Sequence, residues 1–150
     1  MARRAAEMSD ARSPEHVFPL RVYYEDTDAG GIVYYANYLR FAERARMEYL
    51  RSVGADHKSL MAQDGVMFAV RQCSVDYLSP AFLDDPLEVH SRFFDVRGAS
   101  LRAEQVVRRQ ADELARLNVR LACVGSDGRP RRMPQKLRSA FVANLAADGR

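Results

Sequence analysis

Cysteine is scarce in this chain: Cys73 and Cys123 are the only two among 150 residues. Each lies in an apolar-patterned run, so we expect both thiols to be reduced and to pack as small hydrophobes, as is typical of a cytoplasmic protein. Long apolar runs are absent as well, and none could span a bilayer. The first sixteen residues, MARRAAEMSDARSPEH, begin with basic residues but lack the apolar stretch of a secretory signal.

Lysine is almost as rare. Lys58 and Lys136 are the only lysines among 23 basic residues, so nearly all of the positive charge is arginine. The formal net charge is +3 and the pI is near 9.1. Arginine suits bidentate binding of phosphate, although a general compositional bias of the source organism explains its abundance equally well. No zinc-ligand pattern or aromatic–basic motif is present, so we expect no nucleic acid as a partner.

The length and the pattern of the first third predict one domain that begins with a strand and a helix. Residues 1–16 have the composition of a disordered polar tail, and we expect a single domain over residues 17–146. Residues 17–25 have the β-branched and aromatic composition of a strand. From Ala36 onward, apolar side chains recur every three or four residues, which predicts an amphipathic helix ending near Gly54.

The second half of the chain is predicted to be rich in strands. Four segments follow one another with short breaks, at residues 66–79, 86–96, 100–110 and 113–125, and the last alternates between apolar and polar side chains. A short helix from Pro134 ends the pattern. This order predicts an α+β fold, with a five-stranded antiparallel sheet packed on one long helix. Because a sheet face or edge would stay uncovered, we expect a homodimer or homotetramer.

The charged segment between the first strand and the helix resembles a known signature. EDTDAGGIVYYANYLRFAERARMEYLRSVG is similar to the signature region of the 4-hydroxybenzoyl-CoA thioesterase branch of the hot-dog fold, and in particular to the acyl-CoA thioesterases associated with the bacterial Tol–Pal system. The later segment VDYLSPAFLDDPLEV matches the family too, and the resemblance covers residues 17–138. It implies a sheet wrapped around one central helix, and hydrolysis of an acyl-CoA to a free acid and coenzyme A without a cofactor or metal.

The resemblance also implies roles for individual residues. The catalytic carboxylate of the family falls on Asp28, and the residue seven places later, His in many Tol–Pal-type relatives, is Tyr35. At this position the present chain, with Tyr35, resembles the 4-hydroxybenzoyl-CoA enzymes. The strand segment that lines the thioester pocket falls on Phe68, Ala69 and Val70. The turn that holds nucleotide phosphates across a subunit interface falls on Arg97 and Ser100, although this chain has Gly and Ala between them.

Elementary chemistry is consistent with these roles. A helix that starts near Ala36 leaves its first backbone N–H groups free, and its dipole favours an anion. The amide of Tyr35 or of its neighbours is therefore a candidate donor to the oxyanion of a tetrahedral intermediate. Gly30 and Gly31 allow tight turns and close approach of a substrate. Asp28 could attack the thioester directly or act as a general base on water, and the sequence does not choose.

Other interpretations of the same residues stay open. Glu25 and Asp26 are expected to be structural or solvated, and a divalent metal would need more oxygen ligands than this segment offers. A sister branch of the fold carries its carboxylate on the central helix, where Glu43 and Glu48 are candidates, with Glu43 on the polar side. Alternative functions are a hot-dog hydratase or dehydratase and a non-catalytic acyl-CoA-binding protein. The basic segment GRPRRMPQKLR is a candidate for peripheral contact with the inner-membrane surface.

Overall fold

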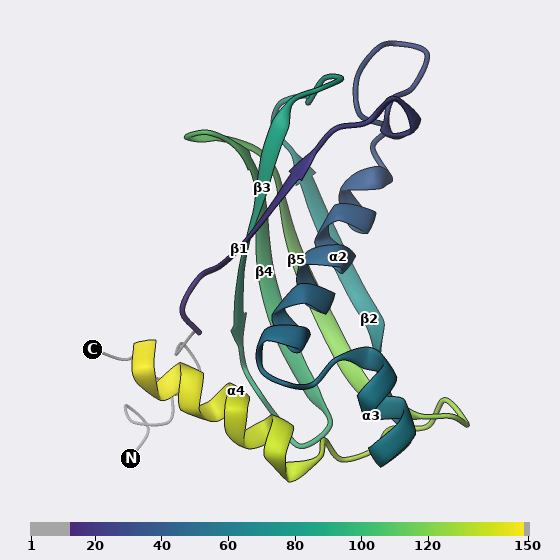
Figure 1. Ribbon diagram of the computed structural model, residues 1–150, viewed down its shortest axis with the longest axis vertical. Coiled ribbons are helices and arrows are strands. Elements are labelled where there is room, and N and C mark those ends of the chain that lie inside the picture. The colour runs from purple at the N-terminus through teal and green to yellow at the C-terminus, as the bar shows by residue number, and fades with distance from the viewer. Residues whose placement is uncertain (1–12, 149–150) are drawn as a thin grey trace.

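The computed structural model describes residues 13–148, and within them five strands form one sheet (Figure 1). The strands are β1 (His16–Arg21), β2 (Val66–Tyr77), β3 (Pro86–Phe94), β4 (Ser100–Arg109) and β5 (Asp112–Gly125). Their order across the sheet is β1-β3-β4-β5-β2, and every neighbouring pair is antiparallel. The prediction of an α+β fold with a five-stranded antiparallel sheet is confirmed.

The four-stranded meander follows the sequence pattern closely. In β5 the side chains that alternate toward one face are buried, among them Leu117, Val119 and Leu121, while Arg120 on the other face is exposed. This period of two is the mark of a sheet with one covered face. The β4–β5 hairpin turns at Gln110, which has a φ of 55°. Because β1 pairs with β3 at the opposite edge from β2, the chain between β1 and β2 has to cross the sheet.

That crossing is made by the long helix α2 (Asn37–Ser52), which lies along one face of the bent sheet (Figure 1). Its buried positions include Phe41, Ala42, Ala45 and Tyr49, spaced by three or four residues, so one stripe of the helix faces the strands. Burial of one such aromatic side chain contributes about 1.5–3 kcal/mol to folding. The helix ends before Gly54, whose φ of 78° suits glycine.

A second helix, α3 (His57–Asp64), follows and was not predicted from the sequence. Asp56 caps its N-terminus, where the carboxylate accepts a hydrogen bond from the Ser59 amide at 3.2 Å. Gly65 ends it in the left-handed conformation with a φ of 64°. These cap residues are standard helix boundaries. The apolar side chains between them show no clear period, which explains why pattern analysis overlooked an eight-residue helix.

The C-terminal helix α4 (Gln135–Asp148) packs across the end of the sheet near the β3–β4 hairpin (Figure 1). Phe141 is buried, with its ring centroid 5.7 Å from that of Tyr49 and 5.9 Å from that of Phe93. Tyr49 and Phe93 themselves stack at 4.1 Å. This aromatic cluster joins α4, α2 and β3. No helix in the described part of the chain is both long and apolar enough to cross a membrane.

The start of the first strand differs from the sequence-based expectation. His16, expected at the end of a polar tail, is the first residue of β1, and Ser13 is buried and accepts a hydrogen bond from the Phe93 amide at 2.8 Å. The rest of the expected tail, residues 1–12, lies outside the described residues. The cysteines also differ from each other: Cys123 is buried, and burial raises its pKa to about 11, but Cys73 is exposed on edge strand β2.

Candidate functional site

The loop between β1 and α2 carries Asp28 at one end of the sheet (Figure 1). Asp28 is exposed, and its Oδ1 accepts a hydrogen bond from the Gly30 amide at 2.8 Å, while its backbone accepts one from the Gly31 amide at 3.0 Å. The other carboxylate oxygen, Oδ2, has no partner within residues 13–148. The carboxylate is thus oriented through one oxygen and available to a ligand through the other.

Asp26 holds this loop in place. The side chain of Asp26 is buried and accepts a hydrogen bond from the Tyr23 amide at 2.8 Å. Its backbone carbonyl accepts two more, from the Tyr34 amide at 2.9 Å and from Nδ2 of the buried Asn37 at 2.8 Å. These bonds tie both ends of the loop to the start of α2. Asp26 therefore has a structural environment, as expected, whereas Asp28 faces solvent.

Tyr35 lies immediately before Ala36, the N-cap residue of α2. Its carbonyl accepts a hydrogen bond from the Tyr77 hydroxyl at 3.0 Å, and its ring is exposed beside those of Tyr34 and Tyr77. The Tyr35 amide has no acceptor among the residues that the structure describes. Ala36 provides no side-chain cap, whereas the Asn37 amide donates to the Tyr34 carbonyl at 2.8 Å and the Leu39 amide to the Ala36 carbonyl at 3.2 Å. The Tyr35 amide, just before this helix terminus, therefore remains available to bind an anion.

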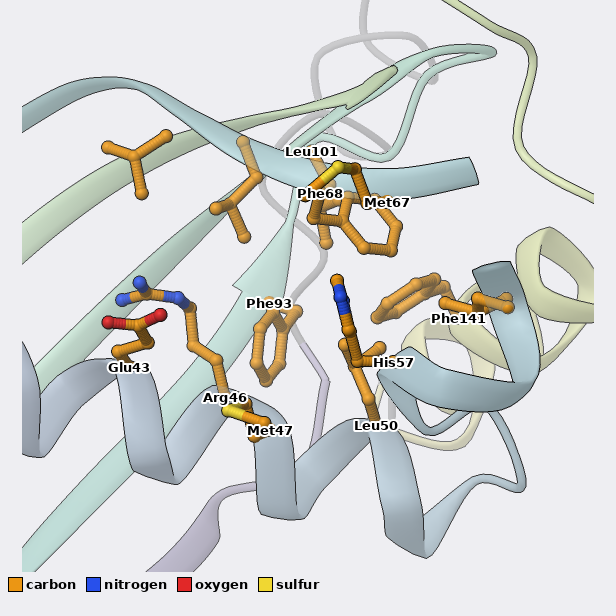
Figure 2. A pocket seen from close by; sticks show the side chains of 13 residues that line it. Glu43, Arg46, Met47, Leu50, His57, Met67, Phe68, Phe93, Leu101 and Phe141 are labelled. Atoms are coloured by element: carbon orange, nitrogen blue, oxygen red, sulfur yellow. The ribbon is translucent and has the colours of Figure 1, made fainter. Parts of the chain in front are cut away.

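A cavity of about 420 Å³ lies between the helices and the sheet (Figure 2). It is lined mainly by apolar side chains: Met47, Leu50, Leu60, Met67, Phe68, Val70, Phe93, Leu101, Leu121 and Phe141. Phe68 and Val70 are among these lining residues, and Ala69, which lies between them on β2, is not. Binding of the thioester by Phe68, Ala69 and Val70 stays a prediction.

Three polar side chains also line the cavity: Glu43 and Arg46 from α2, and His57 from α3. Figure 2 shows Arg46 and His57 pointing from the helices toward the strands, on either side of the Phe93 ring. Burial lowers the pKa of Arg46, and the nearby Glu43 carboxylate opposes that shift. Glu43 is exposed as expected for the polar side of α2, yet it also reaches the cavity wall. Sequence analysis missed Arg46 and His57, because a charged residue on a helix is normally solvated.

Arg97 and Ser100 flank the β3–β4 turn. The Arg97 amide donates a hydrogen bond to the Ser100 carbonyl at 2.8 Å, and the exposed Arg97 guanidinium lies 3.2 Å from Asp95. The register of the sheet places Ser100 beside Ala122, which in turn pairs with Ala69 of β2. The turn is thus at the same end of the sheet as Phe68 and Val70. All five residues expected to bind substrate gather at this end.

Asp28 and Tyr35 lie at the opposite end of the same chain. The Tyr77 hydroxyl that contacts Tyr35 belongs to the last residue of β2, whereas Phe68 and Val70 lie near its first residue, Val66. A single chain therefore does not bring the expected catalytic pair to the cavity. Within the described residues, no cluster of three or more His, Cys, Asp or Glu side chains could hold a metal ion.

A bent antiparallel sheet that wraps around one long helix, with a charged loop at the helix N-terminus and an apolar cavity beside the helix, defines a hot-dog-fold protein. Residues 22–141 match the family model of the thioesterase-like superfamily, and the chain belongs to that family. The resemblance noted from the charged segment is confirmed.

Curated relatives agree with this assignment. The chain is 42% identical to acyl-CoA thioesterase YbgC of Haemophilus influenzae over 125 residues, covering 83% of this chain and 92% of the relative. It is likewise 42% identical to acyl-CoA thioester hydrolase YbgC of Escherichia coli O157:H7, covering 83% of this chain and 93% of that protein. Among solved structures, a hypothetical protein of Thermus thermophilus superposes with a TM-score of 0.80 at 26% identity, covering 85% of this chain and 98% of the other.

Proposed function

We propose that this protein hydrolyses acyl-CoA thioesters, with Asp28 as the reacting carboxylate and the Tyr35 amide as an oxyanion donor. The observation that carries the proposal is the pairing, within one short loop, of a solvent-facing carboxylate with the Tyr35 amide, which has no acceptor among the described residues and lies just before the N-terminus of α2. The names of the YbgC relatives, which are 42% identical over most of the chain, supply the substrate class.

Two chemical routes suit a carboxylate in this position. As a general base, Asp28 takes a proton from water while the water oxygen attacks the carbonyl carbon, and the tetrahedral intermediate then expels the coenzyme A thiolate. As a nucleophile, Asp28 forms a mixed anhydride with the acyl group and releases the thiolate, and water hydrolyses the anhydride in a second step. In both routes negative charge develops on the carbonyl oxygen, where a backbone donor contributes about 2.7–4 kcal/mol.

A second subunit would complete the site. Strand β2 is 12 residues long and forms one edge of the sheet, with Val70 and Tyr77 exposed on it and Leu78 exposed just after it. An exposed apolar edge of this length favours pairing with another strand. A two-fold axis would pair β2 with its copy in antiparallel orientation, so the last residues of one β2 would lie beside the first residues of the other.

This pairing brings the separated groups together. Because Tyr77 contacts Tyr35, the Asp28 loop of one subunit would approach the end of β2 in the second subunit at which Phe68 and Val70 line the cavity. The acyl group would enter the cavity of one subunit while Asp28 of the other attacks the thioester. Arg97 and Ser100 at that same end would hold the phosphates of coenzyme A. We therefore propose a homodimer as the smallest active unit.

The test is thiol release from a panel of acyl-CoA esters of different acyl length and aromatic character. We expect Asp28→Asn to abolish turnover while the protein keeps its circular dichroism spectrum, its oligomeric state and its binding of coenzyme A. The matched control is Glu25→Gln, which changes an exposed acid of the same segment and should keep full activity. Turnover by Asp28→Asn within a few-fold of the unaltered protein would refute this role.

A further inference from the structure

Arg46 is a cation in the wall of a mostly apolar cavity, which Glu43 and His57 also line. Its Nη1 donates a hydrogen bond to Oε1 of Gln105 at 2.9 Å. Gln105 is completely buried, and its Nε2 donates to the Ala42 carbonyl at 3.0 Å and to Oγ of Ser91 at 2.9 Å. Since both of these partners accept from the amide nitrogen, the amide oxygen has to face Arg46. The guanidinium is thereby held in one position beside the cavity.

Most of the hydrogen-bonding capacity of Arg46 is unused. A guanidinium has five N–H donors, and among the described residues Gln105 is its one hydrogen-bond acceptor. Nor does Arg46 form an ion pair within the part of the chain that the structure describes. Enclosure of a charge beside one neutral partner is unfavourable, and burial accordingly lowers the pKa of Arg46. The cavity therefore offers a fixed positive charge and free donors to whatever occupies it.

A water-filled cavity would satisfy the donors but would add no negative charge beyond the solvent-exposed Glu43 carboxylate, which favours the charged form of Arg46. An aliphatic acyl chain would fill the apolar part and leave the donors without acceptors, which costs binding energy. A ligand with an apolar stem and an oxygen acceptor at its tip matches both parts of the wall. A carboxylate is the best such tip, because its two oxygens accept two parallel N–H bonds from one guanidinium.

We propose that Arg46 is a specificity-determining residue, and that the cavity selects acyl groups ending in an oxygen acceptor, most strongly a terminal carboxylate. The inference rests on the proposed function only in that the acyl group arrives as a coenzyme A thioester. Arg46 binds the tip of the acyl group, and the apolar side chains around Phe68 and Phe93 contact its stem.

Glu43 works against a carboxylate ligand, since it lies one turn from Arg46 on α2 and also lines the cavity. Its exposure to solvent screens the repulsion, whereas Arg46 is more enclosed. Neutralising Glu43 should therefore strengthen binding of a carboxylate. His57, the third polar side chain of the lining, is exposed at the start of α3.

The test uses two non-hydrolysable thioethers, S-pentyl-CoA and S-carboxybutyl-CoA, which differ at the tip of the chain. Isothermal titration calorimetry measures Kd for each, and the ratio of the two values is the readout. Because binding needs no turnover, this ratio is independent of whether Asp28 is catalytic or whether any acyl-CoA is hydrolysed. We expect the unaltered protein to bind S-carboxybutyl-CoA about 10- to 100-fold more tightly, as for hydrogen bonds to charged groups.

Arg46→Met should abolish that preference, and Glu43→Gln should increase it severalfold. The control Arg40→Met removes an exposed arginine of the same helix that does not line the cavity, and it should leave the ratio unchanged. If Arg46→Met does not fold by circular dichroism, Arg46→Lys replaces it and should lower the preference by losing the bidentate fork. Equal affinity of the unaltered protein for both thioethers would overturn the proposal. So would a parallel loss of both affinities in the Arg46 variant, which would assign Arg46 a structural role through Gln105.

Discussion

Replacing Tyr35 by proline removes one backbone N–H from the proposed oxyanion site and little else. The Tyr35 amide has no acceptor among residues 13–148, so the substitution breaks no described hydrogen bond. The position directly precedes the N-cap of α2, where a fixed φ is compatible with entry into a helix. The strain falls on Tyr34, which is restricted toward extended angles, although its amide is held by the Asp26 carbonyl.

The expected magnitudes differ sharply between activity and stability. Loss of a single oxyanion donor lowers kcat by about 10²–10³. The free energy of unfolding should change by no more than about 1 kcal/mol, the net value of a typical hydrogen bond. The matched variant is Tyr35→Phe, which keeps the amide and removes only an exposed hydroxyl. We expect its kcat to stay within about tenfold of the unaltered protein.

The assay is steady-state thiol release at saturating acyl-CoA, with circular dichroism and size-exclusion chromatography as controls for folding and assembly. Full activity in Tyr35→Pro would show that this amide does not bind the oxyanion. Loss of activity in Tyr35→Phe as complete as in Asp28→Asn would contradict the reasoning in another way. The phenol would then be the acid or orienting group.

Three further predictions concern assembly, substrate binding and stability. Val70→Asp places like charges along both copies of the β2 edge, so light scattering should detect a 17.0 kDa monomer without thioesterase activity. The control Val142→Asp changes an exposed residue of α4 and should remain a dimer. A dimeric Val70→Asp would exclude pairing through β2. If Arg97 binds phosphate, KM for acyl-CoA should rise with salt while KM for a truncated pantetheine thioester stays constant. Arg97→Ala should remove this difference in salt dependence between the two substrates. Identical salt dependence for both substrates in the unaltered protein would count against phosphate binding by Arg97. Phe141→Ala opens the aromatic cluster under α4 and should lower the free energy of unfolding by about 3–5 kcal/mol in urea titrations. A decrease of less than about 1 kcal/mol would contradict this prediction.

Local pattern in the sequence was sufficient for most of the secondary structure and for the family. The alternation in residues 113–125 and the helical period after Ala36 arise from which face of each element is buried, and that information is written in successive side chains. The signature around Asp28 likewise depends on adjacent residues. The short helix α3 was missed because its caps, Asp56 and Gly65, were its only clear signals.

The arrangement of the site was decided by tertiary structure alone. Sheet register placed Arg97 and Ser100 at the same end as Phe68. Packing of α2 against β4 enclosed Arg46 beside Gln105, although these residues are 59 positions apart. The distance between Asp28 and the cavity has the same origin, since the two lie at opposite ends of one strand. Such relations depend on contacts between residues distant in sequence, which no local period encodes.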